Sequence, residues 1–157
     1  MAKASGKPEE NPRHPMPAQD PRVRVHNFSE VALGYDHETA IAEAQRCIQC
    51  RRPLCVTGCP VQVRIPEFIK ALREEDMWES VALLKDHNSL PAICGRVCPQ
   101  ETQCEAQCVL GRRSQPVAIG RLERYVADWE RTQGMRIPQI DPANGTRVAV
   151  IGSGPAG

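Results

Sequence analysis

Two cysteine-rich segments decide the fold: residues 47–60 read CIQCRRPLCVTGCP, and residues 94–108 read CGRVCPQETQCEAQC. Together they hold all 8 cysteines of the chain in two groups of four, and a proline directly follows both Cys59 and Cys98. Bacterial-type iron–sulfur proteins present soft thiolates to iron in this way, at short spacings that end in Cys-Pro. Two such groups predict two 4Fe–4S clusters, and therefore a role in moving electrons.

Disulfides and structural zinc are the alternative explanations of these cysteines. Disulfides require an oxidising compartment, but the N-terminal residues MAKASGK lack the apolar core of a secretion signal, so we expect a cytoplasmic protein with reduced thiols. Zinc modules with four cysteine ligands usually contain a second Cys-x2-Cys, whereas this sequence has one, at Cys47 and Cys50. A zinc-stabilised protein-interaction module remains the alternative from a different functional class.

The composition does not favour nucleic-acid or membrane partners. Lysine and arginine total 20 against 19 for aspartate and glutamate, so no bulk field attracts a polyanion. Only 4% of the residues are aromatic, which leaves few rings for base stacking, and no apolar stretch is long enough to span a bilayer. With 14 prolines, the hydrophobic core should be modest, and metal–ligand bonds should supply much of the folding energy.

The segments around and between the cysteine groups have helical signals. Asp36 and Asp76 are candidate N-caps, and Pro66 suits the first turn of a helix. Cys104 and Cys108 are four residues apart among good helix formers, so a helix there would place both thiols on one face. We predict an all-α domain with helices over residues 37–46, 65–75, 77–86, 101–108 and 116–133.

The chain divides into four parts. Residues 1–27 are a flexible proline-rich tail, residues 28–137 the helical iron–sulfur domain, and residues 138–146 a linker. Residues 147–157 read RVAVIGSGPAG, in which a buried-strand run leads into G-x-G-x-x-G. A glycine-rich turn that follows a β-strand is the fingerprint of a dinucleotide-binding fold.

That fingerprint predicts the first strand of a Rossmann-type FAD domain. Gly152, Gly154 and Gly157 would form its phosphate-binding turn. The helix whose N-terminus would hold the phosphate is not in this sequence, so we expect the front piece of a longer flavoprotein with a truncated FAD domain. The isolated chain should therefore lack turnover, and no residue in it is assigned a catalytic role.

Four motifs give the chain a specific resemblance to a known family: AQRCIQC at 44–50, GCPV at 58–61, LPAICGRVCPQ at 90–100 and AIGRLER at 118–124. With residues 148–157, they resemble the N-terminal region of the small (beta) subunit of NADPH-dependent glutamate synthase. The resemblance implies a helical domain with two 4Fe–4S clusters in front of a domain that binds FAD and NADPH. Electrons from NADPH-reduced FAD would pass through the clusters to a larger partner subunit or domain with a flavin or iron–sulfur centre.

Related NADPH/FAD oxidoreductases share this module. The runner-up interpretation is the NADPH-side subunit of a bifurcating ferredoxin:NADP transhydrogenase or a sulfide dehydrogenase, and dihydropyrimidine dehydrogenase is a more distant relative. These proteins differ in what the partner subunit does. The residues of this chain therefore leave the substrate and the final electron acceptor open.

The ligands of the two clusters follow in part from the Cys-Pro steps. In two-cluster ferredoxins, the cysteine of that step binds the other cluster. Cys47, Cys50 and Cys55 are therefore assigned to cluster 1, while Cys59 crosses to cluster 2. The resemblance adds Cys108 to cluster 1.

The resemblance also gives Cys98 and Cys104 to cluster 2, and it favours Glu123 as the fourth ligand. Counting thiols favours Cys94 instead, because eight soft ligands for eight irons is the simple solution. A helix over residues 116–133 places Glu123 at the edge of its apolar stripe, so both assignments stay open.

Overall fold

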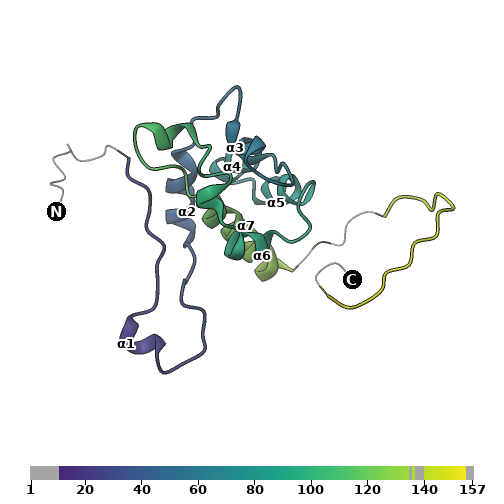
Figure 1. Cartoon of the computed structure of the whole chain (residues 1–157), viewed down its shortest axis with the longest axis horizontal. Coiled ribbons are helices and arrows are strands. Elements are labelled where there is room, and N and C mark those ends of the chain that lie inside the picture. Colours follow the sequence, from purple (N-terminus) through teal and green to yellow (C-terminus); the bar gives the residue numbers. More distant parts are fainter. Residues whose placement is uncertain (1–10, 135, 137–139, 155–157) are drawn as a thin grey trace.

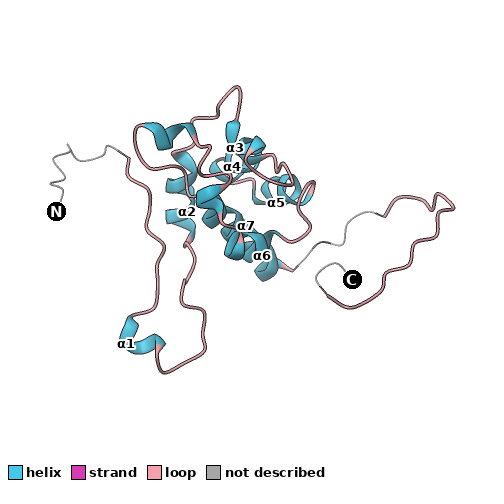
Figure 2. Ribbon diagram, in the orientation of Figure 1, coloured by secondary structure: helices cyan, strands magenta, loops and turns pink. Residues whose placement is uncertain are grey.

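The computed structural model describes residues 11–134, 136 and 140–154, and this part of the chain is helical (Figure 1). Figure 2 shows helices and loops, without a strand in the described ranges, so the all-α prediction is confirmed there. The α-helices are α1 Pro21–Arg24, α2 His37–Gln45, α3 Leu54–Thr57, α4 Ile65–Arg73, α5 Met77–Lys85, α6 Pro91–Val97 and α7 Ile119–Gln133. Two 3-10 helices are η1 Gln100–Thr102 and η2 Val109–Arg112.

Local sequence explains where the long helices begin and end. The Asp36 carboxylate accepts from Thr39 N at the start of α2, and Asp76 accepts from Glu79 N at the start of α5. Pro66 occupies the first turn of α4, where the missing N–H is not needed. Gly134 ends α7 with φ of 86°, a conformation that glycine adopts without strain.

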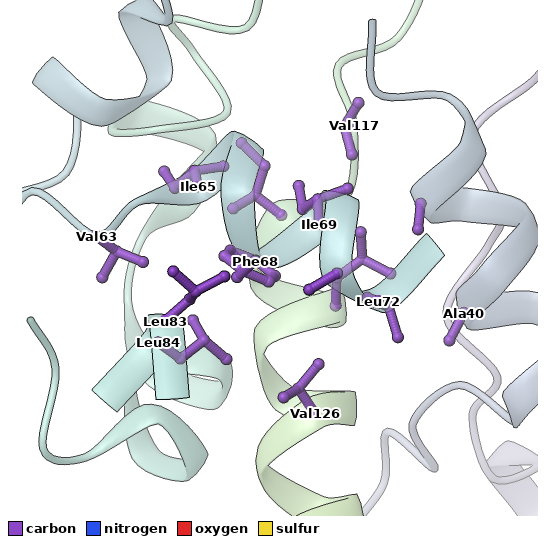
Figure 3. Close-up of a cluster of buried hydrophobic side chains, with 14 of the residues drawn as sticks. Ala40, Val63, Ile65, Phe68, Ile69, Leu72, Leu83, Leu84, Val117 and Val126 are labelled. Carbon is purple, nitrogen blue, oxygen red and sulfur yellow. The ribbon is translucent and has the colours of Figure 1, made fainter. Parts of the chain in front are cut away.

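Helix α4 lies at the centre of the core (Figure 3). Phe68, Ile69 and Leu72 on α4 are at most 1% exposed, and they belong to one cluster with Leu84 of α5 and Leu122 of α7. Helices α2, α5 and α7 all pack against α4, while α6 packs against α7. The cysteines lie in loops and short helices around this small bundle.

The predicted helix over residues 101–108 is wrong. The chain forms only the turn η1 and then irregular turns up to Cys108, so Cys104 and Cys108 do not share one α-helical face. The reason is tertiary: the buried Glu105 carboxylate pairs with Arg13 at 2.8 Å and accepts from Gly120 N at 3.3 Å. These partners, distant in sequence, override the helix propensity of the segment.

The N-terminal residues contain an arm that extends from the bundle, with α1 near its end (Figure 1). Its two sides meet at an isolated bridge between Ala18 and Ala32. Glu30 connects the arm to the bundle through ion pairs with Arg96 and Arg124. Phe28 on this arm is fully exposed.

The run predicted as a strand, residues 147–151, is not a strand in the structure. Val148, Val150 and Ile151 are between 66% and 97% exposed. A strand requires a hydrogen-bonding neighbour, and none is present in the described part of the chain. Gly152 has φ of 105°, as a tight turn can require, whereas the predicted Gly157 lies outside the described residues. No helix in the described ranges is long and apolar enough to cross a membrane.

Candidate functional site

The first cavity collects half of the cysteines. Its lining includes Cys47, Cys50, Cys55 and Cys108, which are the four residues predicted for cluster 1. Cys47 follows the end of α2, Cys55 lies in α3, and Cys108 immediately precedes η2. About 400 Å³ of space free of atoms lies at this cavity, part of it open to solvent. Its other lining residues are mostly apolar, among them Ile48, Leu54, Pro66, Ile69, Leu110 and Val117.

The second cavity collects the other four cysteines together with a carboxylate. Its lining includes Cys59, Cys94, Cys98, Cys104 and Glu123, and about 520 Å³ of space free of atoms lies there, part of it open to solvent. Cys94 lies in α6, and Cys98 is the residue that follows this helix. Both candidates for the fourth ligand, Cys94 and Glu123, therefore reach the same cavity.

The two cavities share a wall. Ile65 at the start of α4 and Ile119 at the start of α7 line both of them. Cys59 lines the second cavity, and its neighbour Gly58 lies against the loop before Cys104: a Cβ on Gly58 would be 2.8 Å from Gln103 O.

The thiols are held in a low-dielectric setting. Burial, and then the nearby Cys47 and Cys108, raise the pKa of Cys55 to about 12. Burial, and then the Glu105 carboxylate, raise the pKa of Cys104 to about 12. Such thiols give up their protons when a metal ion supplies positive charge. Buried thiols of this kind suit metal–thiolate binding.

The donors of each cavity surround a space and do not converge on a single point. In the described part of the chain, no three histidine, cysteine or acidic side chains are close enough to hold one metal ion. A 4Fe–4S cluster instead takes one protein donor for each of its four irons. The four cysteines of the first cavity match this count, and the second cavity offers five candidate donors, its four cysteines and Glu123.

Glu123 is the acidic side chain of the second cavity. It is 9% exposed, and burial raises its pKa to about 7, although the hydrogen bond from Asn88 acts in the opposite direction. Asn88 Nδ2 donates to Glu123 Oε1 at 2.7 Å. The carboxylate thus lies at the cavity, not in solvent beside the neighbouring arginines.

Sequence reasoning missed Asn88 and Gln100. Gln100 Nε2 donates to the Cys94 carbonyl at 2.9 Å, and both amide side chains line the second cavity. Gln100 closes the LPAICGRVCPQ motif, so its position after Cys-Pro was a usable signal. Asn88 lies in the polar stretch after α5, and no local pattern distinguishes it from a loop residue.

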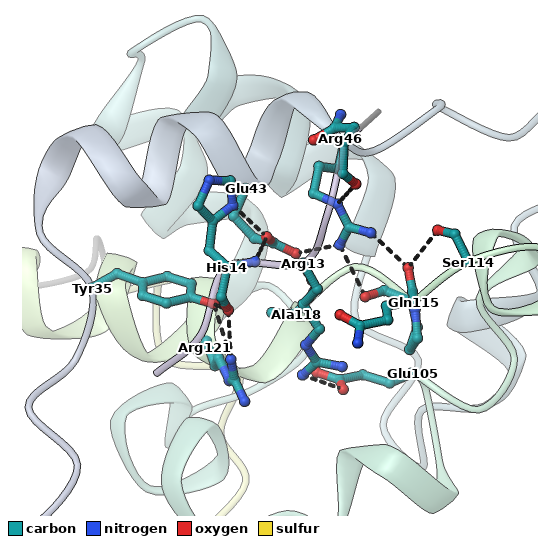
Figure 4. Close-up of polar contacts among 12 residues, drawn as sticks. Arg13, His14, Tyr35, Glu43, Arg46, Glu105, Ser114, Gln115, Ala118 and Arg121 are labelled. Atoms are coloured by element: carbon teal, nitrogen blue, oxygen red, sulfur yellow. Dashed lines mark hydrogen bonds and ion pairs between the residues drawn. The ribbon is translucent and has the colours of Figure 1, made fainter. Parts of the chain in front are cut away.

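Sequence reasoning also missed Glu43, a fully buried carboxylate (Figure 4). Its Oε1 accepts from Arg46 Nη1 and from Ala118 N, both at 2.8 Å, and its Oε2 accepts from His14 N at 2.9 Å. Burial raises its pKa, but hydrogen bonds from His14, Ala118 and Arg46 outweigh burial and hold that pKa below its ordinary value. Glu43 thereby fixes the start of α7 beside the shared wall.

Comparison with known proteins gives a family and a set of relatives. Residues 24–135 match the family described as dihydropyrimidine dehydrogenase domain II, 4Fe–4S cluster. The glutamate synthase [NADPH] small chain of Halomonas elongata is 39% identical over 146 residues, which cover 88% of this chain and 31% of that protein. The Escherichia coli K12 protein of the same name is 38% identical over 143 residues, which cover 90% of this chain and 30% of that protein.

A relative with a different name gives a similar match. The NAD-dependent dihydropyrimidine dehydrogenase subunit PreT of Escherichia coli K12 is 38% identical over 130 residues, which cover 83% of this chain and 32% of that protein. The chain therefore spans about a third of the length of these relatives.

Proposed function

Because the chain belongs to the dihydropyrimidine dehydrogenase domain II family of 4Fe–4S domains, we propose that it is an electron-transfer module with two 4Fe–4S clusters. One observation carries this proposal: the eight cysteines divide into two groups of four, each around its own cavity. A 4Fe–4S cluster accepts and releases one electron at a potential set by its ligands and surroundings.

We assign Cys47, Cys50, Cys55 and Cys108 to cluster 1. Their cavity has thiol donors and mostly apolar walls, so sulfur is the main donor atom that it offers. Cys55 on α3 and Cys108 beside η2 contribute to this cavity from segments that are far apart in the sequence.

We assign Cys59, Cys98, Cys104 and Glu123 to cluster 2, with Cys94 as the alternative fourth ligand. Glu123 extends from α7 into the lining of the cavity and is oriented there by Asn88. A carboxylate oxygen is a harder donor than sulfur, so cluster 2 should differ from cluster 1 in potential. Ile65 and Ile119 line both cavities, which keeps the path between the clusters short.

In the full-length protein, we propose that NADPH reduces FAD and that the clusters relay single electrons to a larger partner subunit. The relatives named as NADPH-dependent small chains support this role. Gly152, Gly154 and Gly157 would form the first phosphate-binding turn for FAD, and residues 147–151 would form a strand once sheet neighbours are present. We also propose a cytoplasmic location. The four parts predicted from the sequence, with boundaries after residues 27, 137 and 146, are kept as part of this proposal.

Two other functions remain as alternatives. The first is the NADPH-side subunit of a ferredoxin:NADP transhydrogenase or sulfide dehydrogenase, which would use the same relay with a different partner. The second is a zinc-stabilised interaction module, which the Cys-x2-Cys at the end of α2 keeps open.

The first experiment is the iron and acid-labile sulfide content of anaerobically purified protein, with its visible spectrum. Two clusters require about eight iron and about eight sulfide per chain, with an absorption that dithionite bleaches. Zinc without sulfide, in protein never exposed to oxygen, would contradict the electron-transfer proposal. The isolated chain should oxidise no NADPH.

A second experiment decides the fourth ligand of cluster 2. Glu123→Ala and Cys94→Ala are compared by iron content and by the electron paramagnetic resonance (EPR) spectrum of the reduced protein. The proposal expects Glu123→Ala to alter cluster 2 and Cys94→Ala to retain it. Loss of cluster 2 in Cys94→Ala alone would show that the glutamate assignment is wrong.

A further inference from the structure

Asn88 connects the two rival side chains of the second cavity. Its Nδ2 donates to Glu123 Oε1 at 2.7 Å, and its Oδ1 accepts from Cys94 Sγ at 3.5 Å. Asn88 is 7% exposed, and all three side chains line the second cavity. A buried amide between two candidate ligands can treat them differently, because one of its ends donates and the other accepts.

The orientation of the Asn88 amide follows from its hydrogen bonds. Leu90 N donates to Asn88 Oδ1 at 3.0 Å, and a backbone N–H can only donate. The oxygen end must therefore face Leu90 and Cys94, and the nitrogen end must face Glu123. The direction of the amide is thus set by the backbone after α5, independently of the cavity.

The two contacts have opposite consequences for metal binding. The hydrogen bond to Glu123 engages Oε1, so Oε2 is the oxygen that can turn toward a metal. The Cys94 thiol meets the oxygen end of the same amide, at 3.5 Å from Oδ1. Asn88 thus presents the carboxylate to the cavity and engages the thiol in a contact that competes with metal binding.

We propose that Asn88 is a positioning residue that selects Glu123 over Cys94 as the fourth ligand of cluster 2. This inference rests on the proposed cluster function. The Asn88 amide holds Glu123 in a single orientation, and it withdraws negative charge from the ligand through the hydrogen bond. Without this amide, Glu123 loses its fixed orientation, and Cys94 becomes free to bind iron.

The sharpest variant is Asn88→Asp. It preserves the acceptor for Leu90 N, and with it the local turn, but replaces the donor to Glu123 with a second carboxylate oxygen. Asn88→Ala removes both hydrogen bonds and serves as the second variant. Cluster 1, which has its own cavity, provides the folding control inside each molecule.

The experiment measures iron per chain, the EPR spectrum and the midpoint potential of each cluster in the anaerobically reconstituted full chain. We expect both Asn88 variants to keep cluster 1 unchanged and to shift the spectrum and potential of cluster 2. We also expect Asn88→Asp with Cys94→Ala to lose about half of the iron, because neither rival can then complete cluster 2. Cys94→Ala alone should keep all of it.

Three outcomes would contradict the proposal, and they distinguish a failure of the Asn88 role from a failure of the Glu123 assignment. An unchanged cluster 2 in Asn88→Asp, where Glu123→Ala does alter it, overturns the selecting role and leaves the ligand assignment standing. Full iron in the double variant also overturns it. Loss of cluster 2 in Cys94→Ala alone overturns the glutamate assignment, and the role of Asn88 with it.

Discussion

The two cavities are built from the same number of cysteines but have different surroundings. The first has four thiols among mostly apolar side chains, whereas the second adds the Glu123 carboxylate and the amides of Asn88 and Gln100. Three thiols of the first cavity are near neighbours in sequence, between Cys47 and Cys55. The comparison teaches that cysteine spacing can indicate the sulfur ligands, whereas Glu123, the carboxylate that distinguishes the second cavity, comes from a separate helix, α7.

The largest effect is expected from variants that remove the metal from one cavity and leave it in the other. Cys55→Ala should lose cluster 1, so that iron falls from about eight to about four per chain. Cys104→Ala should remove cluster 2 instead and serves as the matched control. Iron analysis and EPR check the outcome, and loss of all iron from Cys55→Ala would mean that the cavities do not bind metal independently.

Glu43→Gln should lower the stability of the whole bundle around both cavities. Glutamine cannot accept all the hydrogen bonds from Arg46, Ala118 and His14, and it leaves the buried Arg46 without its charge partner. Disrupting a buried ion pair in this way should cost about 3 kcal/mol of unfolding free energy. Chemical denaturation measures this loss, with Glu38→Gln on the exposed face of α2 as the control.

The pH dependence gives this prediction a second test. Because the folded-state pKa of Glu43 lies below its ordinary value near 4.5, its contribution to stability is present above about pH 4.5 and is lost as the pH falls. The wild-type and Glu43→Gln stabilities should therefore converge in acid. A difference that stays constant down to acidic pH would contradict the role of the ionised carboxylate.

Gly95→Ala should perturb the second cavity selectively. A Cβ on Gly95 would lie 2.6 Å from Arg124 N, so α6 would have to move away from α7 and take Cys94 and Cys98 with it. We expect a loss of about 1–3 kcal/mol and a shift in the cluster 2 spectrum. Gly111→Ala is the matched control near Cys108, because its Cβ would meet nothing closer than 3.8 Å.

The smallest change should be confined to the first cavity. Gln49 Nε2 donates to Cys47 Sγ at 3.4 Å, and hydrogen bonds to cluster ligands help to set the potential. Gln49→Met keeps the length of the side chain but removes the donor. We expect the potential of cluster 1 to fall by roughly 40 mV, the equivalent of about 1 kcal/mol for one electron. The potential of cluster 2, measured in the same titration, is the control.

The features that could be predicted from the sequence are those that depend on interactions between residues close together in the chain. Helices α2 and α5 were predictable because Asp36 and Asp76 act within one turn, and the all-α class followed from such local signals. The grouping of Cys59 with the second set followed from its position before proline.

The rest depends on contacts between distant residues. Glu43 has its partner Ala118 75 residues away, and Asn88 meets Glu123 35 residues away, so neither role leaves a local pattern. The segment before Cys108 has the composition of a helix, yet Glu105 is drawn to Arg13 and Gly120. Tertiary partners override the local sequence in this segment.

The closure of the first cavity by Cys108 has a consequence for biosynthesis. During translation, Cys47, Cys50 and Cys55 leave the ribosome together, but the remaining wall arrives only with Cys108, Val117 and Ile119. Glu123, also on α7, completes the second cavity. The chain must therefore pass through a stage in which its first thiols have been made but not yet enclosed, and the cellular machinery that delivers iron and sulfide would act on both sites only after α7 has begun to emerge.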